Sequence, residues 1–212
     1  MLSSDRLLAF AITAFVVIVI PGPSVLFVVG RALASGRRVA VLTVVGNALG
    51  EYLQVIAVAV GVGALAEQSV AAFTALKLVG GAYLVYLGVR TFRERKSLAA
   101  AIAAPVAARS DQRSFLQGFS VGATNPKTVV FLAAILPQFV SRAGGDVPVQ
   151  ILLLGLVFAA IALVSDTMWA LAAGGFRTWF GRSPRRLELI GGAGGLAIVA
   201  VGAGLLVSGR KD

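Results

Sequence analysis

Long apolar runs separated by short polar segments dominate this chain. Six of these runs are long enough to cross a bilayer as helices, which takes about 20 residues. They cover residues 7–29, 39–65, 70–89, 115–139, 149–173 and 189–208. The third run is the least uniform, because Lys77 lies within it. The pattern predicts an all-α membrane protein with six transmembrane helices.

The composition supports a membrane environment. Of the 212 residues, 58% are hydrophobic and only 13% are charged, whereas soluble domains average about 25% charged residues. The mean hydropathy is +0.92. A water-soluble fold of this size could not bury so many apolar side chains, so lipid must solvate much of the surface.

The basic residues are concentrated in alternate connections between the apolar runs. Segments 30–38, 90–114 and 174–188 carry Arg31, Arg37, Arg38, Arg90, Arg93, Arg95, Lys96, Arg109, Arg113, Arg177, Arg182, Arg185 and Arg186. The other two connections hold only Glu67, and Arg142 with Asp146. The positive-inside rule therefore predicts three cytoplasmic connections and two external termini. We interpret these arginines as topology signals rather than ligand-binding groups, and expect no nucleic-acid partner despite the net charge of +10.

A short motif occurs near the start of each half of the chain. Pro21-Gly22-Pro23-Ser24-Val25-Leu26-Phe27 aligns with Asn125-Pro126-Lys127-Thr128-Val129-Val130-Phe131. Three spans per half is an odd number, so the two halves must cross the membrane in opposite senses. We therefore expect an inverted 3+3 repeat with broken first and fourth helices, as in many secondary transporters. Residues 1–97 form the first repeat, 98–114 a cytoplasmic linker and 115–212 the second repeat.

The prolines of this motif predict free backbone carbonyls inside the membrane. Proline lacks an N–H and clashes with the carbonyl four residues earlier. The carbonyls set free in this way belong to Val17, Val19 and Gly122, and local partners for the breaks are available from Ser24, Thr124, Asn125 and Thr128. Irregular backbone is tolerated in a membrane only where it is buried or lines a cavity. A simple packing kink is the alternative, but two matched breaks favour a cavity.

Three ionisable residues fall deep within the predicted spans: Glu51, Lys127 and Asp166. Each costs about 2.5–3.5 kcal/mol at the centre of a membrane helix, so we expect them to pair or to face water. The group contains two carboxylates and one ammonium, so one carboxylate has no cation of its own to pair with. A desolvated surplus carboxylate can bind a proton or the ammonium of a substrate, but not both at once. Such competition is a minimal mechanism for antiport.

Glu51 belongs to a polar stripe on the second span. Asn47, Glu51 and Gln54 recur at helical spacing and so share one face. Gly46 and Gly50 form a GxxxG pair beside the stripe, which permits another helix to approach closely. The stripe is either part of a transport pathway or a buried structural network, and intramembrane acids favour the pathway.

Together these motifs resemble the lysine exporter (LysE/RhtB-type) amino-acid efflux family. The resemblance rests on Pro21-Gly22-Pro23, Gly46-x-x-x-Gly50-Glu51 and Asn125-Pro126-Lys127, in this order, and covers nearly the whole chain. It implies export of amino acids or related small molecules across the bacterial cytoplasmic membrane, driven by protons. It also implies that Pro21, Gly22, Pro23, Asn125, Pro126 and Lys127 lie near the substrate path. Glu51 stands where such proteins often carry aspartate.

Other functions find less support in the sequence. The chain has no cysteine and no histidine, so the commonest metal ligands and the usual base for a nucleophile are missing. We expect no metal, no cofactor and no enzymatic activity, since Glu51 and Asp166 would make an unusual catalytic pair. A passive channel or a structural membrane subunit is the main alternative. Gly191, Gly195 and Gly202 in the last span indicate close packing within the protein or in a homodimer.

Overall fold

The computed structural model describes residues 2–68, 70–103, 110–141, 145–175 and 183–207, and all regular elements in these ranges are helical. They are α1 (Ser4–Val19), α2 (Pro23–Ser35), α3 (Arg37–Gln68), α4 (Val70–Arg93), α5 (Arg95–Ala103), α6 (Asp111–Ala123), α7 (Pro126–Val130), α8 (Val147–Gly175) and α10 (Pro184–Val207). A π-helical turn, η1 (Phe131–Ile135), and a 3-10 turn, η2 (Leu136–Phe139), continue α7. The all-α prediction is confirmed. Arg109, Arg142, Arg177, Arg182 and part of the expected linker lie outside the described residues.

Several helices have the length and composition of membrane spans. Among the described residues, these are Arg37–Gly61, Asp111–Phe139, Val147–Gly175 and Arg185–Val207, and the bent pair α1–α2 makes a fifth if it counts as one span. Helix α4, which carries Lys77, does not meet the same criterion. Large apolar side chains cover the outside, since Val60 is 77% exposed and Met168 is 66% exposed. Four or five spans are therefore supported, and the six-span arrangement stays a prediction.

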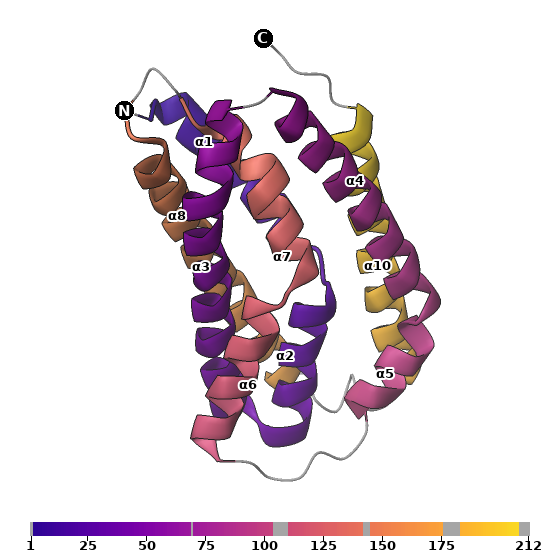
Figure 1. Ribbon diagram of the computed structural model, residues 1–212. Helices are drawn as coiled ribbons and strands as arrows, with labels where there is room; N and C mark the ends of the chain where they lie inside the picture. The colour runs from indigo at the N-terminus through magenta and orange to yellow at the C-terminus, as the bar shows by residue number, and fades with distance from the viewer. Residues whose placement is uncertain (1, 69, 104–109, 142–144, 176–182, 208–212) are drawn as a thin grey trace.

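Both expected helix breaks are present. Helix α1 ends at Val19 and α2 begins at Pro23, with a 55° bend between them. Helix α6 ends at Ala123 and α7 begins at Pro126. In both cases proline occupies the first turn of the new helix, where its missing N–H leaves no intrahelical bond unmade. Figure 1 shows α7 above α6 and α1 above α2, so that the breaks lie near mid-height.

Helices α3 and α6 are in direct backbone contact. Each of four glycines, Gly46, Gly50, Gly118 and Gly122, faces a backbone carbonyl of the other helix so closely that a Cβ would overlap it. Helices α4 and α10 approach each other similarly at Gly88 and Gly195. The close contact expected at Gly46 and Gly50 is confirmed, and Gly195 serves a contact within the chain.

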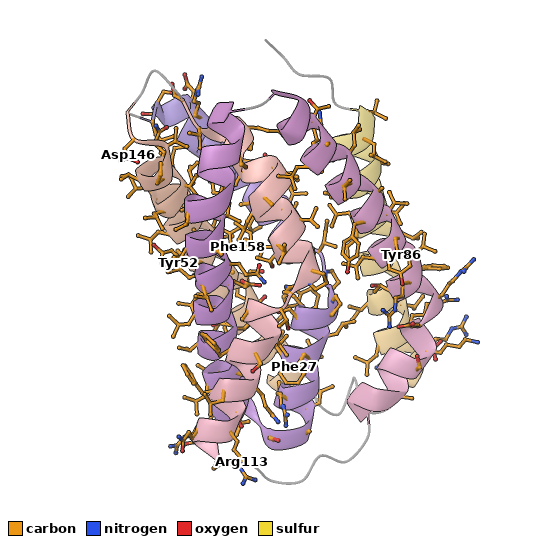
Figure 2. All side chains as sticks on the ribbon, in the orientation of Figure 1. Phe27, Tyr52, Tyr86, Arg113, Asp146 and Phe158 are labelled. Atoms are coloured by element: carbon orange, nitrogen blue, oxygen red, sulfur yellow. The ribbon has the colours of Figure 1, made fainter. Side chains whose placement is uncertain are left out.

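The two ends of the molecule differ in charge. Arg113 lies at the lower end in Figure 2, whereas Asp146 lies at the upper end. Helix α1 begins and α10 ends at the upper end (Figure 1). Between the two ends, a hydrophobic core includes Phe10, Phe131 and Phe158, with the rings of Phe131 and Phe158 stacked at 5.3 Å. The core thus packs against the helix that follows the second break.

Candidate functional site

A cluster of polar side chains is buried where the two breaks meet the middle of α3 and α8. Its members are Ser24, Asn47, Glu51, Gln54, Asn125, Lys127, Thr128 and Asp166, none more than 7% exposed. The sequence singled out all eight, and the fold brings them together from both halves of the chain. Burying polar groups is costly unless they are hydrogen-bonded, so their bonds define the site. We call this group the polar cluster.

Glu51 of α3 is hydrogen-bonded to the second break. Its Oε1 atom accepts from Nδ2 of Asn125 at 3.3 Å and from Oγ1 of Thr128 at 3.1 Å. The side chain of Asn125 also caps α7, because its Oδ1 accepts from the backbone N–H of Lys127 at 3.2 Å. One residue of the break therefore both starts the new helix and positions the carboxylate.

The Gly122 carbonyl, which Pro126 was predicted to leave free, accepts from the backbone N–H of Asn125 at 3.2 Å and also has a partner on α3. Nε2 of Gln54 donates to it at 2.8 Å and to the Asn125 carbonyl at 3.3 Å. Gln54 shares a face of α3 with Glu51, so the predicted polar stripe faces the second break. The side chain of Gln54 is a second donor to each carbonyl, because the Val129 N–H also donates to the Asn125 carbonyl at 3.0 Å.

Lys127 extends from the second break to the first. Its Nζ donates to the carbonyls of Val17 and Ile20, both at 3.0 Å. The predicted free carbonyl of Val17 is thus confirmed. The second acceptor is Ile20 rather than Val19, because the chain leaves α1 at Val19 and is extended at Ile20. Gly22 lies against the same side chain, where a Cβ would come within 3.6 Å of Nζ.

The three ionisable residues were expected to pair or to face water, and Lys127 does not pair directly with a carboxylate. In the described part of the chain its ammonium forms no direct ion pair with Glu51 or Asp166, because the carbonyls at the end of α1 take its hydrogen bonds. The charge still acts at longer range. Lys127 attracts both carboxylates, and the two carboxylates repel each other. The three charges therefore form one electrostatic unit without touching.

Asp166 of α8 is connected to the first break through Asn47. Its Oδ2 accepts from Nδ2 of Asn47 at 3.1 Å, and Oδ1 of Asn47 accepts from Oγ of Ser24 at 2.8 Å. Ser24 lies in the first turn of α2, directly after the first break. Each carboxylate is thus linked to the break of the opposite half of the chain, Glu51 directly and Asp166 through Asn47.

Two buried acceptors of the polar cluster lack a hydrogen-bond donor among the described residues. They are Oε2 of Glu51 and Oε1 of Gln54, which lie one turn apart on α3. An unsatisfied buried acceptor costs about 1–3 kcal/mol, and more if it is charged. The polar cluster can therefore accept a proton or a cationic hydrogen-bond donor at a point that the protein itself leaves unpaired.

Cavities adjoin the polar cluster on one side. A cavity of about 10 Å³ beside Lys127 is lined by Val17, Ile20, Leu84, Phe131, Ile198 and Val201, which is room for about one water molecule. A wider cavity of about 390 Å³ lies nearer the start of α1, between α1, η1–η2 and α10. Val17 and Val201 line both cavities. In this conformation these apolar side chains separate the polar cluster from the wider cavity.

Arg31 was expected in a connecting segment, and this expectation is wrong, because the residue is buried in a helix. Helix α2 continues to Ser35, so Arg31 lies inside the helix and is only 6% exposed. Its guanidinium donates to Oε1 of Gln117 in α6 and lies 5.0 Å from the centre of the Phe27 ring. Arg31 follows Ser24 by seven residues, so both side chains lie on one face of α2. This spacing could have identified Arg31 as a buried residue.

A family model of the LysE-type translocators matches residues 15–209 of this chain. The chain belongs to this family. The resemblance seen in the sequence motifs is confirmed, and the polar cluster lies within the matched residues. As a LysE-type translocator with several apolar helices, the protein is a multi-pass membrane protein.

Relatives of this LysE-type translocator include named exporters. The homoserine/homoserine lactone efflux protein of Salmonella typhimurium is 31% identical, over 95% of this chain and 96% of the relative. The leucine efflux protein of an Enterobacter species is 25% identical, over 92% of each chain. A membrane protein of Vibrio cholerae is 35% identical over 78% of this chain and 80% of its own length. No solved structure matches.

Proposed function

We propose that this LysE-type translocator is a secondary transporter that exports amino acids or related small molecules from the cytoplasm in exchange for protons. The proposal rests on the buried polar cluster at the two helix breaks, in which no described residue donates a hydrogen bond to Oε2 of Glu51. The names of the relatives, which refer to efflux of homoserine, its lactone and leucine, support an amino-acid substrate.

We infer that six membrane helices form an inverted 3+3 repeat, with residues 1–97 and 115–212 as the two halves. Each half contains a broken helix, then a long helix that carries a buried acid, then a glycine-packed helix. The series α1–α2, α3 and α4 corresponds to α6–α7, α8 and α10. Each half then contributes one buried acid, Glu51 or Asp166, that is linked to the break of the opposite half. Residues 98–114 are the connection between the halves.

Proton and substrate compete for Glu51 in this mechanism. The ammonium of an amino acid donates three hydrogen bonds, and Oε2 of Glu51 with Oε1 of Gln54 offers two free acceptors one turn apart. A proton on Glu51 removes the negative charge that attracts the ammonium. Substrate released outward is therefore replaced by a proton, which must leave inward before the next substrate binds.

The wider cavity is the proposed outward route. It lies towards the end where α1 begins, whereas the arginine-rich connections predict a cytoplasmic location for the opposite end. Movement of Val17 and Val201 would join this cavity to the one beside Lys127. The breaks allow such movement, because the segments on either side of each break are not held by a continuous helical hydrogen-bond ladder.

Purified protein in liposomes tests this function. An imposed pH gradient is expected to drive uphill movement of leucine or homoserine, the first substrates to try. Transport only down the gradient of the solute would indicate a channel instead, and no flux of any amino acid would indicate a structural subunit. An efflux screen of dipeptide-loaded cells, with and without the protein, would extend the substrate panel.

The coupling mechanism is tested by neutralising the two acids. Glu51→Gln and Asp166→Asn are each expected to abolish transport driven by the pH gradient, because the exchangeable carboxylate is lost. Asp146→Asn is the matched control: Asp146 is exposed, and asparagine can keep its hydrogen bond to the Val149 N–H. Unaltered proton coupling in both cluster variants would refute the mechanism.

A further inference from the structure

A second charged site lies away from the polar cluster, between α5 and α10. A cavity of about 490 Å³ there is lined by Arg95, Lys96, Arg185, Glu188 and Leu189. Three cations face one carboxylate, so the cavity is positively charged. It lies at the end of the molecule that holds the arginine-rich connections, at the start of the apolar span Arg185–Val207. We call it the basic cavity.

Arg95 is held in a defined position within the basic cavity. Its Nη1 donates to the carbonyl of Phe92 at 2.6 Å, and the guanidinium lies 4.2 Å from the centre of the Phe92 ring. Gly192 of α10 leaves space for it, because a Cβ there would come within 3.1 Å of the Arg95 Cδ. A guanidinium oriented in this way loses little freedom when it binds an anion.

The side chains of the basic cavity are suited to a phosphate group. The planar guanidinium matches a phosphate with two parallel hydrogen bonds, and Lys96 and Arg185 add charge at the same opening. Glu188 can accept from a hydroxyl group next to the phosphate.

An apolar strip leads from the basic cavity along the span. Leu189 lines the cavity and is 65% exposed, and Leu196, seven residues later on the same face of α10, is 58% exposed. A soluble phosphate compound has no apolar part that could contact this strip. A phospholipid has one, because its acyl chains continue from the headgroup into the hydrocarbon layer.

We propose that the basic cavity binds the headgroup phosphate of an anionic phospholipid, with the acyl chains along the Leu189–Leu196 face of α10. Basic pockets between membrane helices are a recurrent form of anionic lipid site. Arg95 and Lys96 lie at the end of the first proposed half, residues 1–97, and α10 belongs to the second half. A bound lipid therefore links the two halves.

Native mass spectrometry of the full-length protein tests the proposal. The protein is offered phosphatidylglycerol and phosphatidylcholine with identical acyl chains. Wild type is expected to retain phosphatidylglycerol preferentially. Each cation near an anionic headgroup favours binding about fivefold, so Arg95→Gln alone should reduce the preference about fivefold. The triple variant Arg95→Gln, Lys96→Gln, Arg185→Gln should lose the preference entirely.

A charge-matched variant separates this site from general attraction to basic proteins. Arg37, Arg93 and Arg113 are exposed cations at the same end that do not line the basic cavity. Their replacement by glutamine should leave the preference intact. An equal loss in this control would overturn the proposal, as would equal retention of both lipids by wild type. If the triple variant folds poorly, the lipid preference of the Arg95→Gln variant tests the proposal by itself.

A soluble competitor identifies the source of the phosphate. Glycerol 3-phosphate at millimolar concentration should leave phosphatidylglycerol bound, because it lacks the chains that contact α10. Displacement by glycerol 3-phosphate would contradict the lipid and indicate a site for a soluble anion. Glu51→Gln should retain phosphatidylglycerol, so failure of the transport mechanism and failure of the lipid site are distinguishable.

Discussion

Lys127 shows how a buried charge can be accommodated without a direct counter-ion. Its ammonium bonds to the carbonyls of Val17 and Ile20 at the end of α1. The carboxyl end of a helix carries a partial negative charge and exposed acceptors. The first break therefore acts as the partner of Lys127. This leaves the carboxylates of Glu51 and Asp166 available for other cations.

Gln54 has a structural role at the second break that can be measured separately. Gln54→Leu removes the donor to the buried carbonyls of Gly122 and Asn125. Both carbonyls keep a backbone donor, the N–H of Asn125 and of Val129, so the loss should destabilise the folded protein by about 0.5–1.5 kcal/mol, the net contribution of a typical hydrogen bond. Unfolding of the purified protein in detergent, followed by circular dichroism, measures the change.

Gln138→Leu is the control for this prediction. Gln138 also donates to a backbone carbonyl, that of Ala134 at 2.7 Å, but its side chain is exposed. Its replacement should change stability by no more than about 0.5 kcal/mol, as for most surface substitutions. Equal effects of the two leucine substitutions would show that the Gln54 bonds do not stabilise the break.

At the scale of elements, the contact between α3 and α6 holds the polar stripe against the second break. Four glycines let the two backbones touch, and this contact brings Glu51 within hydrogen-bond distance of Asn125 and Thr128. Helix packing in membranes relies on such small residues, since lipid offers little hydrophobic driving force between helices. The geometry of the polar cluster therefore depends on the four glycines, whose lack of a side chain lets α3 and α6 touch.

Gly50→Ala should disrupt this contact. The added Cβ would overlap the Phe119 carbonyl and crowd the backbone N of Ala123, neither of which can move without shifting α6. We expect a loss of about 1–3 kcal/mol of stability, typical of overpacking, together with a loss of transport. The midpoint of thermal unfolding in detergent and the liposome assay measure both effects.

Gly61→Ala is a matched control in the same helix. Among the side chains that the structure describes, none lies within 4 Å of a Cβ placed at Gly61. Alanine is also the better helix former by about 1 kcal/mol. This variant should be as stable as wild type or slightly more so. If both alanine variants behaved alike, the close contact of α3 with α6 would be unnecessary for the fold.

For the whole molecule, the distribution of charge predicts its orientation. Basic side chains gather at the end where α6 and α10 begin, and the opposite end holds Arg6 together with Asp5 and Asp146. The positive-inside rule predicts that the first end is cytoplasmic. With this orientation, the proposed export runs from the Arg31 end of the molecule towards the wider cavity near the start of α1.

The lack of native cysteine allows a clean test of this orientation. Single Arg113→Cys and Asp146→Cys variants place a thiol at exposed positions on opposite ends. A membrane-impermeant maleimide should label the Asp146 variant in intact cells, and the Arg113 variant only after permeabilisation. The reverse labelling pattern would invert the topology and the proposed direction of export.

The sequence alone was sufficient for the all-helical membrane class, the two breaks, the close contact at Gly46 and Gly50, and the family. These features follow from local properties: the length of an apolar run, the missing N–H of proline and the missing Cβ of glycine. Such properties act on the neighbouring backbone whatever the rest of the chain does. Even the eight members of the polar cluster could be named, because polar side chains are conspicuous in an apolar run.

Only the tertiary structure decided which partners these residues take. Lys127 bonds to carbonyls 107 and 110 residues away rather than to the acids expected for it, and Arg31 is buried beside Gln117 of α6. The basic cavity likewise joins residues of α5 and α10 that are about 90 positions apart. Such choices depend on how helices are rotated against each other, and that rotation is set by the packing of the whole bundle rather than by any one segment.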